Sequence, residues 1–462
     1  MKFDVKATKE VMASKKVVVV GLGRSGKAAV QTLNALGATV TVQDSSPIDK
    51  IDPKFIKYLE RESVEMCLGE DLLPDEKFDI MVLSPGVSPD LPFIAEARNK
   101  GVEVIGELEL AYRLSEADYV AITGTNGKTT TTTLTHAIFR EGGAKASAVG
   151  NIGIPAISVA AESREGEWLI AEVSSFQLET VSEFKPKISA ILNLTPDHLN
   201  RHKTMEAYGA AKARIFAKQT ASDILVINAD DADCFALAKG CRARVIPFSR
   251  KDKKVPGAYV DEGRIVVADE EGNVHDICGT DEILIPGEHN VENVLAASAI
   301  AFFAGISPEV IGNTIRKFPG VEHRIEYCGD VDGVEFYNDS KGTNTDATII
   351  ALKALKNNII LIAGGDGKGQ DFTELANHLK GSVKAMVMLG RDAGIIAEAA
   401  EKAGFRDIFF EKDMNACVNK AVELAEEGDK ILLSPACASW DMYDNYEQRG
   451  EHFKECVELL LK

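Results

Sequence analysis

A repeated pattern constrains the fold most strongly: short β-branched apolar runs, each followed by a glycine or polar turn and a longer helical stretch. Residues 17–20, 120–123 and 359–363 are runs of this kind. Continuous apolar strands that alternate with helices are typical of parallel sheets covered on both faces. We therefore predict an α/β protein whose ligands bind at the carboxyl ends of the strands.

The domain organisation follows from where this pattern begins afresh, near Val17, Val120 and Ile359. A chain of 462 residues also fits three domains at about 150 residues each. We predict three domains: a Rossmann-like N-terminal domain over 1–107, a central α/β domain over 108–319 and a Rossmann-like C-terminal domain over 320–462.

Charge and cysteine usage exclude several classes of protein. The 71 acidic and 52 basic residues give a net charge of −19, which argues against a nucleic-acid partner. The eight cysteines form no C-x-x-C pair, so neither a disulfide framework nor a zinc site is expected. The chain starts without a signal-peptide pattern and contains no run of about 18 apolar residues. We expect a cytoplasmic protein with no membrane insertion.

A phosphate loop is predicted in the middle of the chain, where Gly-Thr-Asn-Gly-Lys-Thr-Thr occupies 124–130 after an apolar strand. Backbone N–H groups of such a loop bind phosphate oxygens at a helix N-terminus. Lys128 would reach the β- and γ-phosphates and Thr129 would ligate Mg²⁺. Ile122 replaces the first glycine of the usual spacing, so an ordinary βα turn is the alternative. The favoured interpretation is a P-loop ATPase-type central domain.

The first domain opens with a G-x-G-x-x-G fingerprint over 21–26, and Asp44 ends the next strand. Alone, this pattern suggests a dinucleotide-binding domain such as that of a nicotinamide dehydrogenase. The same geometry suits any diphosphate on a helix N-terminus, including that of a UDP moiety.

Six segments in order resemble the Mur ligase family, whose members are ATP-dependent amide-forming enzymes that build the peptidoglycan stem peptide. Besides the phosphate loop, they are Glu-Val-Ser-Ser-Phe-Gln-Leu-Glu at 172–179, Asn-Leu-Thr-Pro-Asp-His at 193–198, Pro-Gly-Glu-His-Asn-Val-Glu-Asn at 286–293, His-Arg-Ile-Glu at 323–326 and Asn-Asp-Ser-Lys-Gly-Thr-Asn at 338–344.

The resemblance implies ATP as co-substrate, together with two Mg²⁺ ions. The residues implied for ATP are Gly124, Thr125, Asn126, Gly127, Lys128, Thr129, Thr130, Asn293, Arg324, Asp339 and Lys341. Those implied for metal are Thr129, Glu172, His198 and Lys212, the last as a carbamate formed with CO₂. Those implied for catalysis are Lys128, His198, Lys212 and Arg324.

Each of these assignments has a simpler alternative. Glu172 could cap a helix, His198 could be a packed histidine and Lys212 could be a solvated charge on a helix. Asn293 could be an ordinary polar residue near a helix start, and the third-domain loops could be simple βα turns.

The Gly-Leu-Gly-Arg-Ser-Gly loop resembles that of the members that add D-glutamate to UDP-N-acetylmuramoyl-L-alanine. The precursor contacts implied are Gly23, Arg24, Ser25, Asp44, Ser45, Ser84, Gly86 and Asn151. The D-glutamate contacts implied are Thr343, Lys368, Ser439 and Tyr446. Tyr446 stands where a phenylalanine is expected, and Trp440 also departs from the pattern, so the shape of the amino-acid pocket stays open.

The expected activity is therefore ATP-dependent ligation of D-glutamate to UDP-N-acetylmuramoyl-L-alanine through an acyl phosphate, by a monomer. A folylpolyglutamate synthase is the nearest rival enzyme, but it usually lacks a preceding UDP domain. A non-catalytic nucleotide-binding regulator is the rival from another class, and it would be expected to lose Lys128, Glu172 or His198, which are all present.

Overall fold

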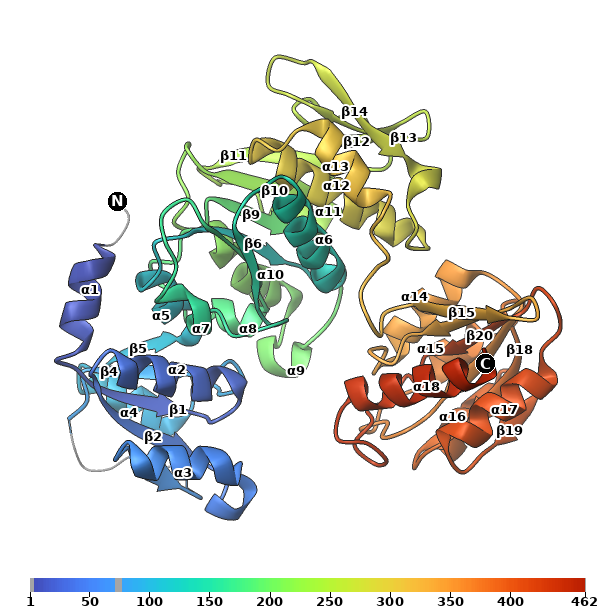
Figure 1. Ribbon diagram of the computed structural model, residues 1–462, viewed down its shortest axis with the longest axis horizontal. Helices are drawn as coiled ribbons and strands as arrows, with labels where there is room; N and C mark the ends of the chain where they lie inside the picture. Colours follow the sequence, from blue (N-terminus) through green and yellow to red (C-terminus); the bar gives the residue numbers. More distant parts are fainter. Residues whose placement is uncertain (1–3, 71–76, 462) are drawn as a thin grey trace. The chain divides into compact units, whose positions relative to one another are not determined.

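Three β-sheets follow one another along the chain in the computed structural model, which describes residues 4–70 and 77–461 (Figure 1). Parallel strands alternate with helices in each of them, so the predicted α/β class is confirmed. Contacts divide the chain into two units. The first comprises the chain up to Glu282 together with Glu292–Arg316 and holds two sheets; the second comprises Ile283–Val291 together with the chain from Lys317 and holds one. The predicted boundaries at 107 and 319 stay predictions.

The first sheet is fully parallel, with the strand order β3-β2-β1-β4-β5. This is a doubly wound order, in which the direction of winding reverses between β1 and β4, the point where such sheets bind ligands. Its strands are β1 (Lys16–Val20), β2 (Thr39–Asp44), β3 (Glu65–Leu68), β4 (Ile80–Leu83) and β5 (Glu103–Gly106). Its helices are α1 (Val5–Met12), α2 (Arg24–Ala35), α3 (Pro53–Arg61) and α4 (Pro92–Asn99).

The central sheet has nine strands in the order β14-β13-β12-β11-β10-β9-β6-β8-β7. It is parallel from β7 to β12, and β13 and β14 extend it in antiparallel pairing that the sequence pattern did not predict. The strands are β6 (Asp118–Thr123), β7 (Ala146–Gly150), β8 (Trp168–Glu172), β9 (Ile188–Ile191), β10 (Ile224–Asn228), β11 (Arg244–Ser249), β12 (Gly257–Asp261), β13 (Arg264–Ala268) and β14 (Val274–Gly279).

The helices that follow the first sheet run from α5 to α13. They are α5 (Glu107–Arg113), α6 (Lys128–Glu141), α7 (Ile157–Ala160), α8 (Ser175–Leu178), α9 (Leu199–His202), α10 (Met205–Ala213), α11 (Ala232–Ala236), α12 (Glu288–Phe303) and α13 (Pro308–Ile315).

The third sheet has the order β15-β16-β20-β17-β18-β19, and only its edge strand β15 is antiparallel. The strands are β15 (Glu326–Val331), β16 (Val334–Asn338), β17 (Ile359–Ala363), β18 (Val383–Met388), β19 (Ile408–Phe410) and β20 (Lys430–Leu433). The helices are α14 (Thr345–Leu355), α15 (Thr373–Asn377), α16 (Ala393–Lys402), α17 (Met414–Leu424) and α18 (Tyr446–Leu460).

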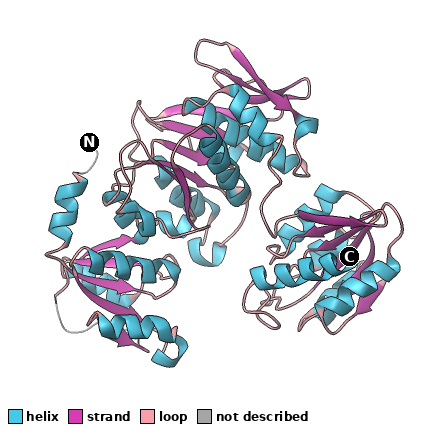
Figure 2. Cartoon of the chain, viewed as in Figure 1, coloured by secondary structure: helices cyan, strands magenta, loops and turns pink. Residues whose placement is uncertain are grey.

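The continuous apolar runs are explained by helices on both faces of these sheets (Figure 2). In β17, Leu361 packs in one hydrophobic cluster, whereas Ile360 and Ile362 pack in another on the opposite face. In β1, Val17 and Val19 likewise join one cluster, and Val18 and Val20 join a second. Because successive side chains point to opposite faces, a strand buried on both sides needs an apolar residue at every position.

Helix α5 joins the first sheet to the central one through two buried carboxylates. Glu107 accepts a hydrogen bond from the backbone N–H of Ile157 at 2.7 Å, and burial raises its pKa to about 7. Glu109 accepts from the backbone N–H groups of Ser182 (2.9 Å) and Phe184 (3.0 Å). Within the described residues, no helix is both long enough and apolar enough to cross a membrane.

Candidate active site

The phosphate loop predicted from sequence lies between β6 and α6. Gly127 has φ +80° and directly precedes the helix, so the loop turns through a left-handed residue. Asn193, which follows β9, holds the loop from the neighbouring strand. Its Oδ1 accepts from the Asn126 N–H at 2.8 Å, and its Nδ2 donates to the Asn126 carbonyl at 3.1 Å. The loop is therefore fixed at the carboxyl edge of the central sheet before any ligand binds.

The lysine of the loop folds back over its own backbone. Lys128 Nζ donates to the carbonyl oxygens of Gly124 at 3.0 Å and Thr125 at 2.8 Å. The hydroxyl-bearing residues Thr129 and Thr130 behind it are buried. The ammonium group is thus held against the loop by two of its carbonyl oxygens, in a type of loop whose backbone N–H groups bind phosphate oxygens.

Asn293 of α12 packs directly against this loop. Its Oδ1 accepts from the Thr131 hydroxyl at 3.2 Å, and a Cβ at Gly127 would lie only 2.2 Å from the same oxygen. Only glycine fits there. The interpretation of Asn293 as an ordinary helix residue is therefore incomplete, because its amide touches the phosphate loop.

Glu172 ends β8, the strand next to β6, in register with Ile122, which lies two residues before the phosphate loop. Only 2% of the residue is exposed. One carboxylate oxygen, Oε1, accepts from Asn151 Nδ2 at 2.8 Å, and the other, Oε2, is buried with no hydrogen-bond partner. Glu172 caps no helix, since the cap of the following helix α8 is Ser174.

His198 lies in the loop beyond β9 and forms the N-cap of the short helix α9, with φ +53°. Its side chain is 48% exposed, with Nε2 3.4 Å from Asp197 Oδ2. Its ring lies 4.8 Å from that of Phe176. It is therefore a solvent-facing histidine and not a packed one. The neighbouring His202 is the buried residue of this pair, and its Nε2 is 2.9 Å from the Ser175 hydroxyl.

Lys212 is 1% exposed, which rules out the interpretation as a solvated charge. It lies on α10, where Nζ donates to the Gly124 carbonyl at 2.8 Å and sits 4.4 Å from the centre of the Tyr208 ring. Burial, together with the positive charge of Lys128, lowers the pKa of Lys212 well below its usual value. The lowered pKa favours the neutral form of the amine, which lies beside the phosphate loop.

Among the residues that the structure describes, no three His, Cys, Asp or Glu side chains gather closely enough to form a metal cluster. The predicted ligands Glu172 and His198 contribute only two such groups, and the others are a hydroxyl and a lysine. The buried, unpartnered Oε2 of Glu172 nevertheless suits a divalent cation, because hard cations prefer carboxylate oxygen.

The fingerprint loop of the first sheet has the close packing that its glycines allow. A Cβ at Gly26 would lie 1.8 Å from the Gly21 carbonyl oxygen, whereas Gly23 and Gly86 face open space. Asp44 accepts from the backbone N–H groups of Leu22 (2.6 Å) and Ser46 (2.8 Å). It therefore orders the turn in addition to any ligand contact.

The remaining predicted precursor residues lie after strands of the first sheet, except for one residue that lies in the central sheet. The Ser84 hydroxyl, after β4, donates to the Gly21 carbonyl at 2.7 Å. Arg24 and Ser25 begin α2, and Ser45 is exposed beyond β2. Asn151 lies apart from these, beside Glu172 in the central sheet.

Three loops of the second unit leave neighbouring parallel strands at one sheet edge, because β16, β20 and β17 are adjacent. Asp366 and Ala438 exchange two backbone hydrogen bonds of 2.9 Å, which ties the loop of Lys368 to the loop of Ser439. Lys368 Nζ lies 4.5 Å from the centre of the Trp440 ring. Trp440 thus packs on a residue predicted to bind D-glutamate.

Asp339 and Arg324 meet in the second unit. Asp339 is buried, accepts from the Ser434 hydroxyl at 2.7 Å, and has its pKa raised to about 6 by burial despite the opposing charge of Arg324. Arg324 lies between two residues with positive φ, His323 (+61°) and Ile325 (+46°), and its Nε is buried without a partner. The strained backbone at 323–325 therefore carries the Arg324 guanidinium, whose Nε–H makes no hydrogen bond.

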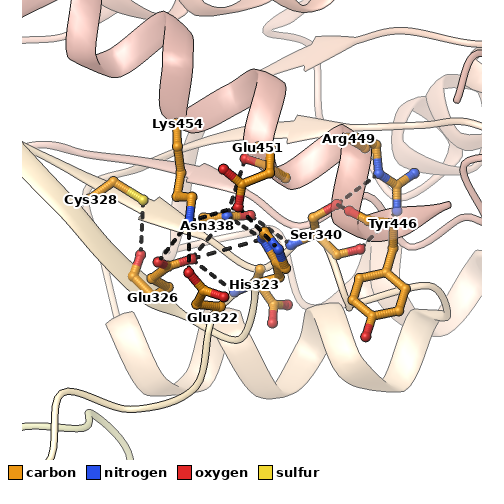
Figure 3. A network of polar contacts seen from close by, with 12 residues as sticks. Glu322, His323, Glu326, Cys328, Asn338, Ser340, Tyr446, Arg449, Glu451 and Lys454 are labelled. Carbon is orange, nitrogen blue, oxygen red and sulfur yellow. Dashed lines mark hydrogen bonds and ion pairs between the residues drawn. The ribbon is translucent and has the colours of Figure 1, made fainter. Parts of the chain in front are cut away.

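A polar network fixes that segment to α18 (Figure 3). Asn338 Nδ2 donates to His323 Nδ1 at 2.9 Å and to Glu326 Oε2 at 3.1 Å. Since Nδ1 accepts, the ring proton belongs on Nε2, which faces Glu451 at 3.5 Å. Lys454 of α18 lies 2.9 Å from Glu451 and 3.4 Å from Glu326. The network compensates the backbone strain on either side of Arg324.

Arg449 braces the same edge and was missed by sequence reasoning. It is buried, and it donates to the Ser340 hydroxyl (3.0 Å), the Ser340 carbonyl (2.8 Å) and the Cys437 carbonyl (3.1 Å). Burial lowers its pKa to about 10. Ser340 in turn donates to the Tyr446 carbonyl at 2.8 Å. A lone arginine in a helical pattern carries no signal of this role. Asn193 belongs to one of the six motifs, but its contact with the phosphate loop was not predicted.

Comparison with known proteins gives matches along most of the chain. Residues 15–106 match a Mur ligase MurD-like N-terminal domain, 122–301 a Mur ligase middle domain and 323–437 a Mur ligase glutamate ligase domain. The chain belongs to the Mur ligase family. The UDP-N-acetylmuramoylalanine--D-glutamate ligase of Thermoanaerobacter pseudethanolicus is 47% identical over 96% of this chain and 98% of its own. The ligase of the same name from Clostridioides difficile is 45% identical over 97% and 99%.

Solved structures of the Mur ligase family share the fold. The UDP-N-acetylmuramate-alanine ligase MurC of Thermotoga maritima superposes with a TM-score of 0.60 at 18% identity, over 96% of this chain and 100% of its own. MurF of Acinetobacter baumannii gives 0.58 at 16% identity, over 84% and 92%. The match of 15–106 to a Mur ligase N-terminal domain disfavours a nicotinamide dehydrogenase.

Proposed function

We propose that this chain is an ATP-dependent ligase that joins D-glutamate to UDP-N-acetylmuramoyl-L-alanine in peptidoglycan precursor synthesis. The observation that carries this function is the full-length similarity to ligases of that name, at 47% and 45% identity. The match of the first domain to a MurD-like model distinguishes this branch from the other Mur ligases.

We propose that the phosphate loop and Asn293 of the first unit contact ATP, and the resemblance to the family also implies Arg324, Asp339 and Lys341 as ATP contacts. The loop geometry, the position of Lys128 and the tight contact of Asn293 support the first group. The buried, unpartnered Nε of Arg324 supports the second, since guanidinium suits phosphate geometry.

Two Mg²⁺ ions would be held by Thr129, Glu172, His198 and a carbamylated Lys212. When bound, they supply positive charge that neutralises the phosphate oxygens. The Oε2 of Glu172, which has no hydrogen-bond partner, supports this set, as does the lowered pKa of Lys212, because it favours the neutral amine that attacks CO₂. Carbamylation would turn this lysine into an oxygen ligand of the kind Mg²⁺ prefers.

The precursor would bind along the first sheet at Gly23, Arg24, Ser25, Asp44, Ser45, Ser84 and Gly86, and at Asn151 of the central sheet. The open space beside Gly23 and Gly86 supports this placement. D-Glutamate would bind Thr343, Lys368, Ser439 and Tyr446, and the link between the Lys368 and Ser439 loops supports that pairing. We also propose a cytoplasmic, monomeric enzyme.

The proposed reaction has two steps. The L-alanine carboxylate of the precursor attacks the γ-phosphorus of ATP, giving an acyl phosphate and ADP, while Lys128 and Arg324 neutralise the phosphate charge. The amine of D-glutamate then attacks the acyl carbon, a proton leaves the nitrogen, and phosphate departs from the tetrahedral intermediate. Phosphoryl transfer depends mainly on such positioning and charge neutralisation.

A phosphate-release assay with UDP-N-acetylmuramoyl-L-alanine and Mg-ATP tests this function. D-Glutamate should stimulate release, whereas L-glutamate and other D- or L-amino acids should give little. Lack of D-glutamate-dependent release from the folded protein would refute the proposal, and preference for another amino acid would refute the acceptor assignment.

A further inference from the structure

The turn formed by Gly150 and Asn151 lies directly against the end of β8. The Gly150 backbone has φ +99°, and a Cβ there would lie 2.3 Å from the Glu172 carbonyl oxygen. The Asn151 N–H donates to that carbonyl at 3.0 Å. The absence of a side chain at Gly150 therefore lets the next residue sit beside Glu172, and the backbone holds it there.

The side chains of these two residues also meet. Asn151 Nδ2 lies 2.8 Å from Glu172 Oε1. A carboxylate can only accept, so the amide nitrogen, and not its oxygen, must face Glu172. Glu172 is 2% exposed, and its two carboxylate oxygens differ. Oε1 is hydrogen-bonded to Asn151, whereas Oε2 has no hydrogen-bond partner.

We propose that Asn151 is a positioning residue for a divalent cation, which it serves by holding Oε1 of Glu172 so that only Oε2 is presented as a ligand. This inference rests on the proposed function, in which Glu172 is a metal ligand, and it gives Asn151 a role besides the predicted precursor contact. Without the amide, the carboxylate would be free to rotate about its last bond, and a rotating ligand binds more weakly. Hydrogen bonds that orient metal ligands in this way typically contribute 10- to 100-fold to metal affinity.

Mn²⁺ titration followed by electron paramagnetic resonance tests the role of Asn151, using the full-length protein with ATP but without precursor or D-glutamate. Mn²⁺ stands in for Mg²⁺, and no turnover is needed. Asn151→Ala should weaken Mn²⁺ binding by about tenfold or more. Its metal-free unfolding temperature should fall, because Oε1 of the buried Glu172 loses its hydrogen bond, so Mn²⁺ binding is measured well below the unfolding transition of either protein. Asn99→Ala, at the exposed end of α4, is the matched control and should bind normally.

Glu172→Gln separates the possible failures. If Glu172→Gln loses Mn²⁺ affinity but Asn151→Ala does not, the positioning role is wrong and the proposed function stands. If Glu172→Gln binds Mn²⁺ like the wild type, both the metal assignment of Glu172 and the inference are wrong. Should Asn151→Ala fail to fold, Asn151→Ser replaces it, because its short hydroxyl does not reach Oε1. The D-glutamate assay tests the proposed function separately.

Discussion

Lys212 Nζ donates a hydrogen bond to the carbonyl oxygen of Gly124 over 2.8 Å, so a buried amine from α10 contacts the first residue of the phosphate loop. No carboxylate accepts a hydrogen bond from this amine among the described residues. Burying a cation without a carboxylate is costly, and the pKa of Lys212 falls accordingly.

The lowered pKa predicts that Lys212 reacts with CO₂. With ¹³C-bicarbonate, the protein should show a carbamate carbon resonance that disappears in Lys212→Arg, because a guanidinium stays protonated. Lys218→Arg, at a half-exposed lysine paired with Glu183, should keep the resonance. A carbamate signal that survives in Lys212→Arg would place the modification elsewhere.

The contact between Gly127 and Asn293 predicts a loss of ATP affinity in Gly127→Ala. The new Cβ would lie 2.2 Å from Asn293 Oδ1 and force the loop or the amide to move. Gly143→Ala is a matched control, because Gly143 has the same φ of +80° but open space around it. Both variants carry about 1–2 kcal/mol of left-handed backbone strain. Calorimetric ATP titration should show weaker binding for Gly127→Ala alone, and equal affinities would contradict the steric argument.

Arg449→Lys should destabilise the second unit and raise the KM for D-glutamate. A lysine cannot reproduce the three hydrogen bonds to Ser340 and Cys437, and a buried acceptor left unpaired costs about 1–3 kcal/mol. Thermal unfolding and initial rates measure the two effects. Arg406→Lys, at an exposed position before β19, should change neither. An unaltered unfolding temperature in Arg449→Lys would show that the hydrogen bonds of Arg449 to Ser340 and Cys437 do not stabilise the second unit.

Glu107→Gln should flatten the pH dependence of stability near neutrality. Burial raises the folded-state pKa of Glu107 from 4.5 to about 7, so the folded protein binds more protons than the unfolded chain between these values. The resulting stabilisation is present below pH 4.5 and is lost as the pH rises through 7. A shift of this size corresponds to roughly 3 kcal/mol.

Urea unfolding of the first unit between pH 5 and 8 measures this effect. The wild type should lose stability with rising pH more steeply than Glu107→Gln. Glu60→Gln, at an exposed site on α3, should follow the wild type. Parallel curves for the wild type and Glu107→Gln would mean that Glu107 is ionised in the folded protein throughout.

Parallel core strands such as β17 were predictable because they are continuous apolar runs, and the two hydrophobic clusters on either side of β17 explain why. The antiparallel strands β13 and β14 were not. β13 pairs with the strand just before it and β14 pairs with β13, so the partners are close in sequence, but Val274–Gly279 mixes exposed and buried positions without a long apolar run. The helix at Glu107–Arg113 buries the carboxylates of Glu107 and Glu109, which no local sequence pattern indicates.

By itself, the sequence determined the α/β class, the position of the phosphate loop and the family, because glycine spacing and apolar runs act locally along the chain. Only the tertiary structure decided the state of individual side chains. Lys212 and Arg449 look like solvated charges on helices, yet both are buried, and Asn151 turns its amide to Glu172 from 21 residues away. Burial and pairing depend on which strands become neighbours, and that information is not contained in any local stretch of sequence.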